Sequence, residues 1–180
     1  MLADFDRKKE QLWFPILQQV GFSSLEITQN AMDQENAIDA SGIDSDGIEK
    51  YFALRIRDEG SYSGQRLQQY KQEFTIRYSR PTGVPVEWQK LFELYLQVFP
   101  DFFCYGWFNR EHITDYVVLD VRVLKYFHQQ GYLQQYETNR RRNINGLRSE
   151  LVFIPLRELL QLPYADRLIV YHSENHPVFL

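Results

Sequence analysis

The chain has 180 residues, 44% of them hydrophobic and 16% aromatic, and a formal net charge of −4. A chain of this length can bury most of its apolar surface around one core, and its aromatic content favours strands, so we expect one sheet-containing domain over residues 1–180. The single cysteine excludes an internal disulfide and a cysteine-rich zinc site, and no apolar run approaches the roughly 20 residues that cross a bilayer, so we expect a cytoplasmic protein with no membrane contact.

The N-terminal part of the chain predicts a helix, a short strand and then a hairpin. Apolar residues recur at helical spacing from Phe5 to Val20, and Pro15 is expected to kink this helix. Leu25–Thr28 is typical of a short strand. Asp44–Gly47 indicates a turn, because Asp-Gly favours tight hairpin loops, so the segments on either side of it should be antiparallel neighbours. The second of these segments is Ile48–Arg57.

Two arginines share one face of that second strand. Because successive side chains of a strand point to opposite faces, Arg55 and Arg57 lie on the same face as Ala53. The opposite face carries the apolar residues Phe52, Leu54 and Ile56. We therefore expect one face to be core and the other to be available for a site.

The middle of the chain predicts a loop, a strand and a helix. Asp58–Gln72 is polar and contains two glycines, which indicates an exposed loop. Glu73–Tyr78 alternates as a strand does and carries a third arginine, Arg77. Apolar residues then recur at helical spacing over Glu87–Val98.

The C-terminal part adds further strands and helices. Phe102–Phe108 and Ile113–Leu119 are strand candidates, and Asp120 suits the N-cap of a helix that ends near Gln130. The basic segment between residues 137 and 148 is either a solvated loop or one that contacts phosphates. The last elements expected are a strand at Leu151–Ile154, a short helix at Pro155–Leu162 and a strand at Leu168–Tyr171. The fold class is therefore α/β (α+β), with a mixed central β-sheet flanked by helices.

The hairpin with its acidic and basic residues resembles the PD-(D/E)XK (restriction-endonuclease-like) superfamily. In that superfamily an acidic residue ends one strand, and an (Asp/Glu)-x-Lys pair on the next strand completes a divalent-metal site. Gly42-Ile43-Asp44 resembles the first acidic motif, and a wider pattern from Asp39 to Asp120 is similar to uncharacterised bacterial and phage proteins with this fold. The resemblance implies a restriction-endonuclease-like fold, Mg²⁺ as cofactor and DNA as partner.

The second motif departs from that pattern, because Arg55-x-Arg57 stands where the superfamily has (Asp/Glu)-x-Lys. A guanidinium cannot ligate Mg²⁺ and repels it. One repair is a carboxylate that has moved to another element, and Glu87 is the candidate, because Lys90 lies three residues further on and shares its helix face. The other repair is a site that has lost its metal and kept phosphate binding.

The first repair names the residues of a nuclease site. Asp44, Glu87 and Lys90 are the catalytic candidates, and Asp44, Asp39 and Glu87 are the candidate ligands of Mg²⁺, which would activate water while the lysine assists. Two plainer interpretations stay open. Asp44 and its neighbours can serve only as a turn, and Glu87 with Lys90 can be an ordinary surface ion pair.

Arginines on two strands are the candidate phosphate ligands. Arg55, Arg57 and Arg77, with Arg80 just beyond them, offer paired donors that match phosphate oxygens. The alternative is that these arginines pair with Asp or Glu across a half-exposed sheet face.

Three functions are compatible with these residues. The leading hypothesis is a divalent-metal-dependent DNA endonuclease with a degenerate or migrated active site. The alternatives are a non-catalytic module that binds phosphate, nucleic acid or protein, and an oligomeric structural protein such as a homodimer. The chain has no Gly-rich phosphate loop, dinucleotide fingerprint or Gly-x-Ser-x-Gly elbow, which argues against those enzyme classes.

Overall fold

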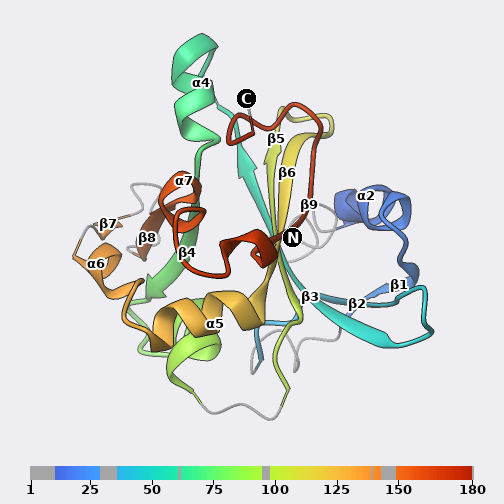
Figure 1. Cartoon of the computed structure of the whole chain (residues 1–180), viewed down its shortest axis with the longest axis horizontal. Helices are drawn as coiled ribbons and strands as arrows, with labels where there is room; N and C mark the ends of the chain where they lie inside the picture. The colour runs from blue at the N-terminus through green and yellow to red at the C-terminus, as the bar shows by residue number, and fades with distance from the viewer. Residues whose placement is uncertain are drawn as a thin grey trace.

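The computed structural model describes residues 11–28, 36–60, 62–94, 98–138, 140–142 and 149–179. A six-stranded sheet in the order β1-β2-β3-β5-β6-β9 forms its centre (Figure 1). Neighbouring strands are antiparallel except β3 and β5, which run parallel, so the predicted mixed central sheet is confirmed. The strands are β1 (Ser23–Ile27), β2 (Ala40–Ile43), β3 (Glu49–Asp58), β5 (Phe102–Phe108), β6 (Ile113–Asp120) and β9 (Ile169–His172).

A smaller sheet and most of the helices cover one side of the central sheet. The smaller sheet has three strands in the order β4-β8-β7, with bounds Glu73–Ser79, Glu150–Pro155 and Arg141–Arg142. Figure 1 shows this sheet with α5 (Val121–Gln129), α6 (Gln134–Glu137) and α7 (Leu156–Leu159) on one side, and α2 (Phe14–Gln19) on the other. The remaining helical segments are η1 (Gln11–Trp13), α4 (Gly64–Tyr70), η2 (Gln89–Glu93) and η3 (Ala165–Arg167).

The predicted hairpin is present. Strands β2 and β3 pair antiparallel, with Ile43 opposite Glu49. Gly47 in the turn has φ +76°, a conformation that glycine adopts without a steric cost. The turn closes with a hydrogen bond from the N–H of Asp44 to the carbonyl of Ile48 at 3.0 Å.

The two faces of β3 join different cores, as the alternation of its side chains predicts. Phe52 and Leu54 pack with Trp13 and other residues of the N-terminal part. Ala53, on the opposite face, packs in the core shared by β5, β6 and the smaller sheet. The arginine-bearing face of β3 therefore looks toward the smaller sheet.

A glycine lets the N-terminal helical segment approach the central sheet closely. A Cβ at Gly106 of β5 would lie 2.9 Å from the ring of Trp13, so a larger residue would push that ring away. The indole Nε1 of Trp13 donates to the carbonyl of Arg55 at 3.3 Å. This contact anchors the first helical segment on the strand that carries the arginines.

Several local expectations differ from the structure. Pro15 is the second residue of α2. The N–H that proline lacks would have no partner within the helix in this first turn, so Pro15 is accommodated there and does not lie in the helix interior, where it would cause a kink. Residues 64–70, expected in a loop, form α4. The helix expected over Glu87–Val98 is reduced to a short segment around η2, because Leu94 is already extended with ψ 136°. Residues 5–10 of the first predicted helix and residues 95–97 of the second lie outside the described residues.

The strands β5 and β6 and the helix α5 confirm the remaining predictions near the sheet. The side chain of Asp120 accepts a hydrogen bond from the N–H of Arg122 at 2.7 Å, which makes it the N-cap of α5. The strand β4 is also present, but it pairs with β8 in the smaller sheet and not in the central one. Over the described part of the chain, no helix has the length and apolar character needed to cross a membrane.

Candidate functional site

Four charged side chains from four parts of the chain are linked by ion pairs. We call Asp39, Arg55, Arg77 and Glu87 the arginine–carboxylate cluster. Asp39 immediately precedes β2, Arg55 and Arg77 belong to β3 and β4, and Glu87 lies between β4 and η2. The cluster therefore joins the central sheet to the smaller one.

Asp39 is held in place by the backbone of the hairpin. Its N–H donates to the carbonyl of Phe52 at 2.8 Å, which extends the pairing of the two strands by one step beyond Ala40. Its carboxylate then accepts the N–H of Leu54 at 2.6 Å, and its side chain is only 3% exposed. A buried carboxylate needs such partners because losing its hydration is costly.

Arg55 connects the two carboxylates of the cluster. Its Nη1 lies 2.9 Å from Oδ2 of Asp39, and its Nη2 lies 2.9 Å from Oε1 of Glu87. Nη1 also donates to the carbonyl of Leu54 at 2.7 Å. With 24% of its side chain exposed, Arg55 places one planar positive charge between two buried negative ones.

Glu87 is stabilised as a carboxylate by two arginines. Burial alone would raise the pKa of Glu87, but the positive charges of Arg55 and Arg77 lower it below its usual value. The N–H of Arg77 adds a hydrogen bond to Oε2 at 3.0 Å, and Nη1 of the same residue lies 3.7 Å from Oε1. The carboxylate therefore stays charged in the folded protein.

Arg57 lies beside the cluster on the same face of β3, among aromatic rings. Its guanidinium is 4.1 Å from the ring centre of Tyr70 and 5.2 Å from that of Phe153. It donates to the hydroxyl of Tyr105 at 3.3 Å, and that hydroxyl is 2.8 Å from Oγ1 of Thr75. These contacts fix the plane of Arg57 by cation–π and hydrogen-bond interactions.

Asp44, the first predicted metal ligand, lies in the hairpin turn and not in the cluster. Its Oδ1 accepts the N–H groups of Asp46 and Ile48 at 3.0 and 2.9 Å, and its Oδ2 lies 3.7 Å from Nζ of Lys50. The hydrogen bond from Ile48 is the main cause that lowers the pKa of Asp44. Asp39 lies five residues earlier, about 16 Å along an extended strand, so the two aspartates cannot hold the same ion. Asp44 matches the plainer interpretation, a turn residue.

The other two predicted catalytic residues are both buried. Glu87 and Lys90 are 5% and 8% exposed, so they are not the ordinary surface ion pair considered as an alternative. The backbone N–H of Lys90 donates to the carbonyl of Val86 at 3.0 Å, which places it in the turn that follows Glu87. The structure therefore brings together Asp39, Glu87 and two of the three predicted phosphate ligands, with Arg57 adjacent.

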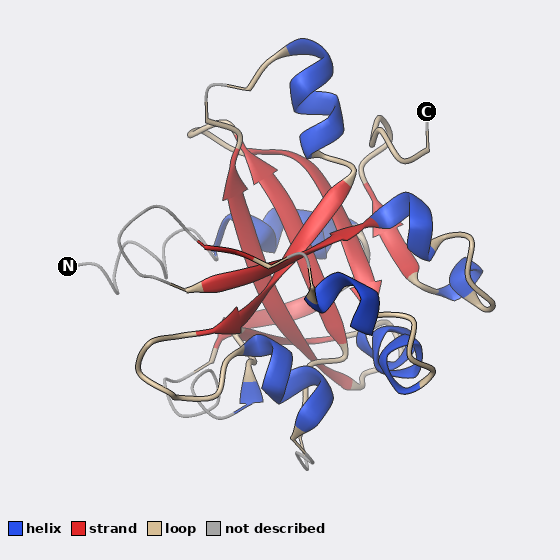
Figure 2. Cartoon of the chain, turned by 90° about the vertical axis from the view of Figure 1, so that its left-hand side faces the viewer, coloured by secondary structure: helices blue, strands red, loops and turns tan. Residues whose placement is uncertain are grey.

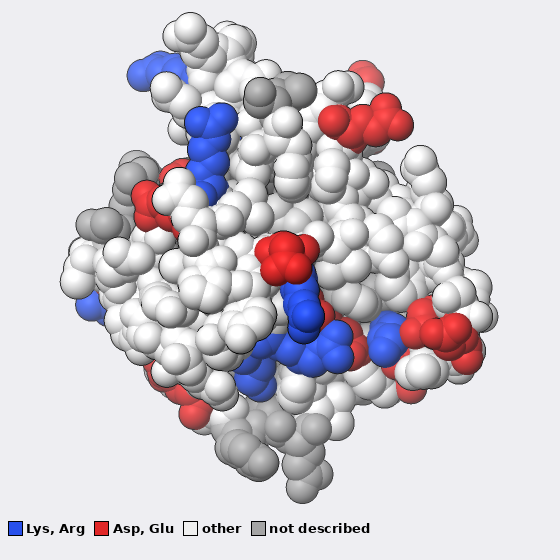
Figure 3. Space-filling view, in the orientation of Figure 1, with Lys and Arg blue, Asp and Glu red and all other residues white. Residues whose placement is uncertain are grey.

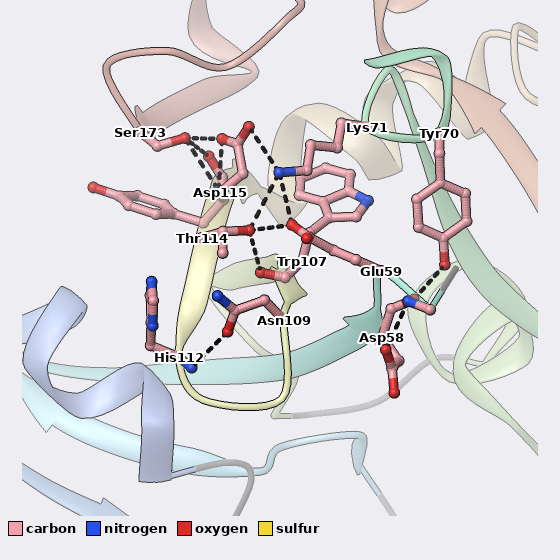
Figure 4. Close-up of polar contacts among 12 residues, drawn as sticks. Asp58, Glu59, Tyr70, Lys71, Trp107, Asn109, His112, Thr114, Asp115 and Ser173 are labelled. Carbon is pink, nitrogen blue, oxygen red and sulfur yellow. Dashed lines mark hydrogen bonds and ion pairs between the residues drawn. The ribbon is translucent and has the colours of Figure 1, made fainter. Parts of the chain in front are cut away.

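A second polar cluster escaped the sequence analysis (Figure 4). Nζ of Lys71 lies 2.8 Å from Oε1 of Glu59 and 3.7 Å from Oδ2 of Asp115, and it donates to Oγ1 of Thr114 at 3.2 Å. The hydroxyl of Ser173 donates to Oδ1 of Asp115. Burial raises the pKa of Asp115 to about 6 despite the nearby ammonium. Glu59 and Lys71 fall in the segment expected to be an exposed loop, and only its fold brings them to β6.

A group of Lys and Arg side chains near α5 has acidic side chains against it (Figure 3). Arg122 of this helix is bonded to the carboxylate of Asp120 at 2.9 Å, and 72% of its side chain is exposed. Nζ of Lys125 lies 3.7 Å from the ring centre of Phe99. These contacts are typical of a solvated helix surface.

No family model, curated protein or solved structure matches this chain at a significant level. Within the described ranges, no group of three or more His, Cys, Asp and Glu residues is arranged to hold a metal ion. The chemistry of the arginine–carboxylate cluster follows from its own side chains. The cluster contains two carboxylates, Asp39 and Glu87, that are paired with arginine. Its donors reach the surface at Arg77, whose side chain is 33% exposed.

Proposed function

We propose that this chain is a non-catalytic domain with a restriction-endonuclease-like fold that binds nucleic-acid phosphates. The observation that carries the proposal is the position of Arg55, which contacts Asp39 and Glu87 at 2.9 Å each. An arginine between two carboxylates supplies the positive charge that a divalent ion would otherwise supply there. The DNA endonuclease hypothesis stays open to a direct test.

The residues of the cluster do not fit Mg²⁺ as they are arranged. Magnesium needs oxygen ligands at about 2.1 Å in octahedral geometry. The guanidinium of Arg55 is bonded to both carboxylates, and it would repel a second cation. Because both carboxylates are already paired with Arg55, we assign no metal-dependent step to this site.

The likeness to the superfamily is supported by the strand arrangement. The antiparallel hairpin of β2 and β3 is followed by β5, which lies parallel to β3. Asp39, beside Arg55, takes the place of the acidic residue that the hairpin brings next to the second motif. In this comparison Asp39, and not Asp44, corresponds to the first acidic motif.

The arginines that we propose as phosphate ligands lie on the smaller sheet and at its end. Arg77 is partly exposed, and Arg80 is exposed just after β4. The guanidinium of Arg140, which precedes β7, lies 4.3 Å from the ring centre of Tyr78 in β4. Arginine forks bind phosphate oxygens in pairs, and aromatic rings beside them can stack on bases. This combination supports nucleic acid as the partner, including DNA.

Binding can be tested with two pairs of substitutions that remove the same charge. Labelled DNA in duplex and single-stranded form is titrated with the protein at low salt and followed by fluorescence anisotropy. Arg77→Gln with Arg80→Gln should weaken binding about tenfold, because each lost phosphate contact costs affinity. Arg157→Gln with Arg167→Gln, at exposed positions of α7 and η3, should change it less than about twofold.

Two results would overturn the proposal. Equal losses of affinity in both double variants would mean that binding of DNA depends only on the net charge of the protein. An absence of DNA binding by the unsubstituted protein would exclude the proposed function. Incubation of DNA with the protein and Mg²⁺ or Mn²⁺ should leave it intact. Cleavage that is abolished by Asp39→Asn would establish the endonuclease instead.

A further inference from the structure

The helix α4 (Gly64–Tyr70) stands out from the body of the protein. Figures 1 and 2 both show it projecting beyond the ends of the central strands. None of its seven residues is buried. It follows β3 in the chain, so the strand that carries the arginines leads directly toward it.

The two sides of α4 have different characters. Leu67 and Tyr70, three residues apart and therefore on one side, are half-buried. The hydroxyl of Tyr70 donates to the carbonyl of Asp58 at 3.1 Å, and its ring centre is 4.6 Å from that of Tyr62. The other side presents exposed residues only, and these are Gln65, Arg66, Gln68 and Gln69.

The exposed glutamines and arginine of α4 are not needed to stabilise the helix. A helix of seven residues, about 10 Å long, is marginal in water, because the cost of nucleation is spread over few hydrogen bonds. No acidic residue occurs in residues 64–70, so Arg66 has no carboxylate within the helix. Its three glutamines and one arginine present hydrogen-bond donors and acceptors to a partner molecule.

We propose that α4 enters the major groove of duplex DNA and reads base edges there. This rests on the proposed function, since the arginine–carboxylate cluster and its neighbours would hold the phosphates. The major groove of B-DNA is about 12 Å wide and admits a helix. A glutamine amide pairs with adenine through two hydrogen bonds, and arginine pairs with guanine in the same way.

The position of α4 relative to Arg57 supports this assignment. Tyr70, the last residue of the helix, carries the guanidinium of Arg57 at 4.1 Å from its ring centre. A helix in the groove would therefore have the positive charge of Arg57, which packs against the rings of Tyr70 and Phe153, close to its base. The helix α4 itself carries one positive charge, Arg66, and no carboxylate, which matches a polyanion.

The test compares glutamines on two helices. Gln65→Ala with Gln69→Ala changes the centre of the exposed side of α4, and Gln18→Ala with Gln19→Ala changes two exposed glutamines of α2. We measure anisotropy with AT-rich and GC-rich DNA duplexes, an RNA duplex and single-stranded DNA. The α4 variant should lose about tenfold in affinity for AT-rich DNA duplex and little for the other three probes, and the α2 variant should bind all probes as the unsubstituted protein does.

The outcomes separate this inference from the function on which it rests. If the α4 variant binds every probe normally while Arg77→Gln with Arg80→Gln loses affinity, α4 does not read DNA and phosphate binding stands. If the α4 variant loses affinity equally for single-stranded DNA, groove reading is excluded. If the unsubstituted protein binds none of the probes, both proposals fall. Circular dichroism at matched concentration confirms that the variants are folded.

Discussion

Arg55 shows how a single residue decides the chemistry of the whole site. Glutamate at this position would add a third carboxylate beside Asp39 and Glu87, whereas arginine forms an ion pair with each of them. Removing one member of a buried ion-pair set leaves uncompensated charge, which costs more than the pair contributes. The cluster should therefore respond strongly to the loss of this one side chain.

Replacing Arg55 with alanine is expected to lower the free energy of unfolding by about 3 kcal/mol, because the buried Asp39 loses its ion pair and the buried Glu87 loses one of its two arginines. Urea unfolding followed by tryptophan fluorescence measures this. Arg122→Ala is the matched control, since Arg122 pairs with Asp120 while largely exposed, and it should cost less than about 1 kcal/mol. Equal effects of the two substitutions would contradict the structural role assigned to Arg55.

At the scale of elements, two titratable groups, His176 and Asp115, hold the segment after β9 against the central sheet. The ring of His176 is completely buried, and its centre is 5.1 Å from that of Trp107 in β5. Burial lowers the pKa of His176 to about 4, with the charges of His172 and Lys71 as smaller causes. Asp115, which accepts the hydroxyl of Ser173 in the same segment, has its pKa raised to about 6 by burial.

These two groups should give opposite pH dependence of stability. The pKa of Asp115 is about 6 in the folded protein and 3.8 in the unfolded chain. Its contribution to the free energy of unfolding therefore decreases as the pH rises from 3.8 to about 6. The pKa of His176 is about 4 in the folded protein and 6.5 in the unfolded chain. Its contribution to the free energy of unfolding therefore decreases as the pH falls from 6.5 to about 4. The two effects oppose each other between about pH 4 and 6, where neither is visible alone.

Single substitutions should separate them. Relative to the unsubstituted protein, Asp115→Asn should lose stability on acidification from pH 6 to 4, because only the His176 effect remains. His176→Phe should gain stability over the same range for the converse reason. Each change amounts to about 3 kcal/mol, since one pKa unit corresponds to about 1.4 kcal/mol. Parallel pH profiles for both variants and the unsubstituted protein would show that neither group titrates as assigned.

At the scale of the whole molecule, charge placement matters more than total charge. The net charge of −4 repels a polyanion at long range, so binding must come from local arginines. Arg57, Arg77 and Arg80 lie on or next to β3 and β4, and Glu87 neutralises part of the charge of Arg77. Such a surface should bind nucleic acid with modest affinity and with clear dependence on salt.

Three phosphate contacts predict a slope of about −2.7 in a plot of log affinity against log salt, or about a 40-fold loss between 50 and 200 mM salt. Removing Arg77 should reduce the slope by about 0.9. Anisotropy titrations of duplex DNA at several salt concentrations measure both values. A slope near zero would mean that binding, if observed, does not involve these phosphates.

The sequence predicted most strands and the hairpin because these depend on local signals. Alternation assigned the faces of β3 correctly, and Asp44–Gly47 is a turn. The helix α4 was missed because it lacks the apolar periodicity by which helices are recognised. In the site, Asp39, Glu87 and the arginines were chosen by residue type, but their mutual contacts could not be derived.

The sequence by itself determined the residue types available for chemistry and the local structure around Asp44 and Arg55, since turn formation and side-chain alternation act over a few residues. Only the tertiary structure decided that Asp39 and Glu87 meet at Arg55, away from Asp44. The reason is physical: Glu87 reaches Arg55 through the packing of β4 and η2 against the central sheet, which depends on apolar contacts between residues far apart in the chain.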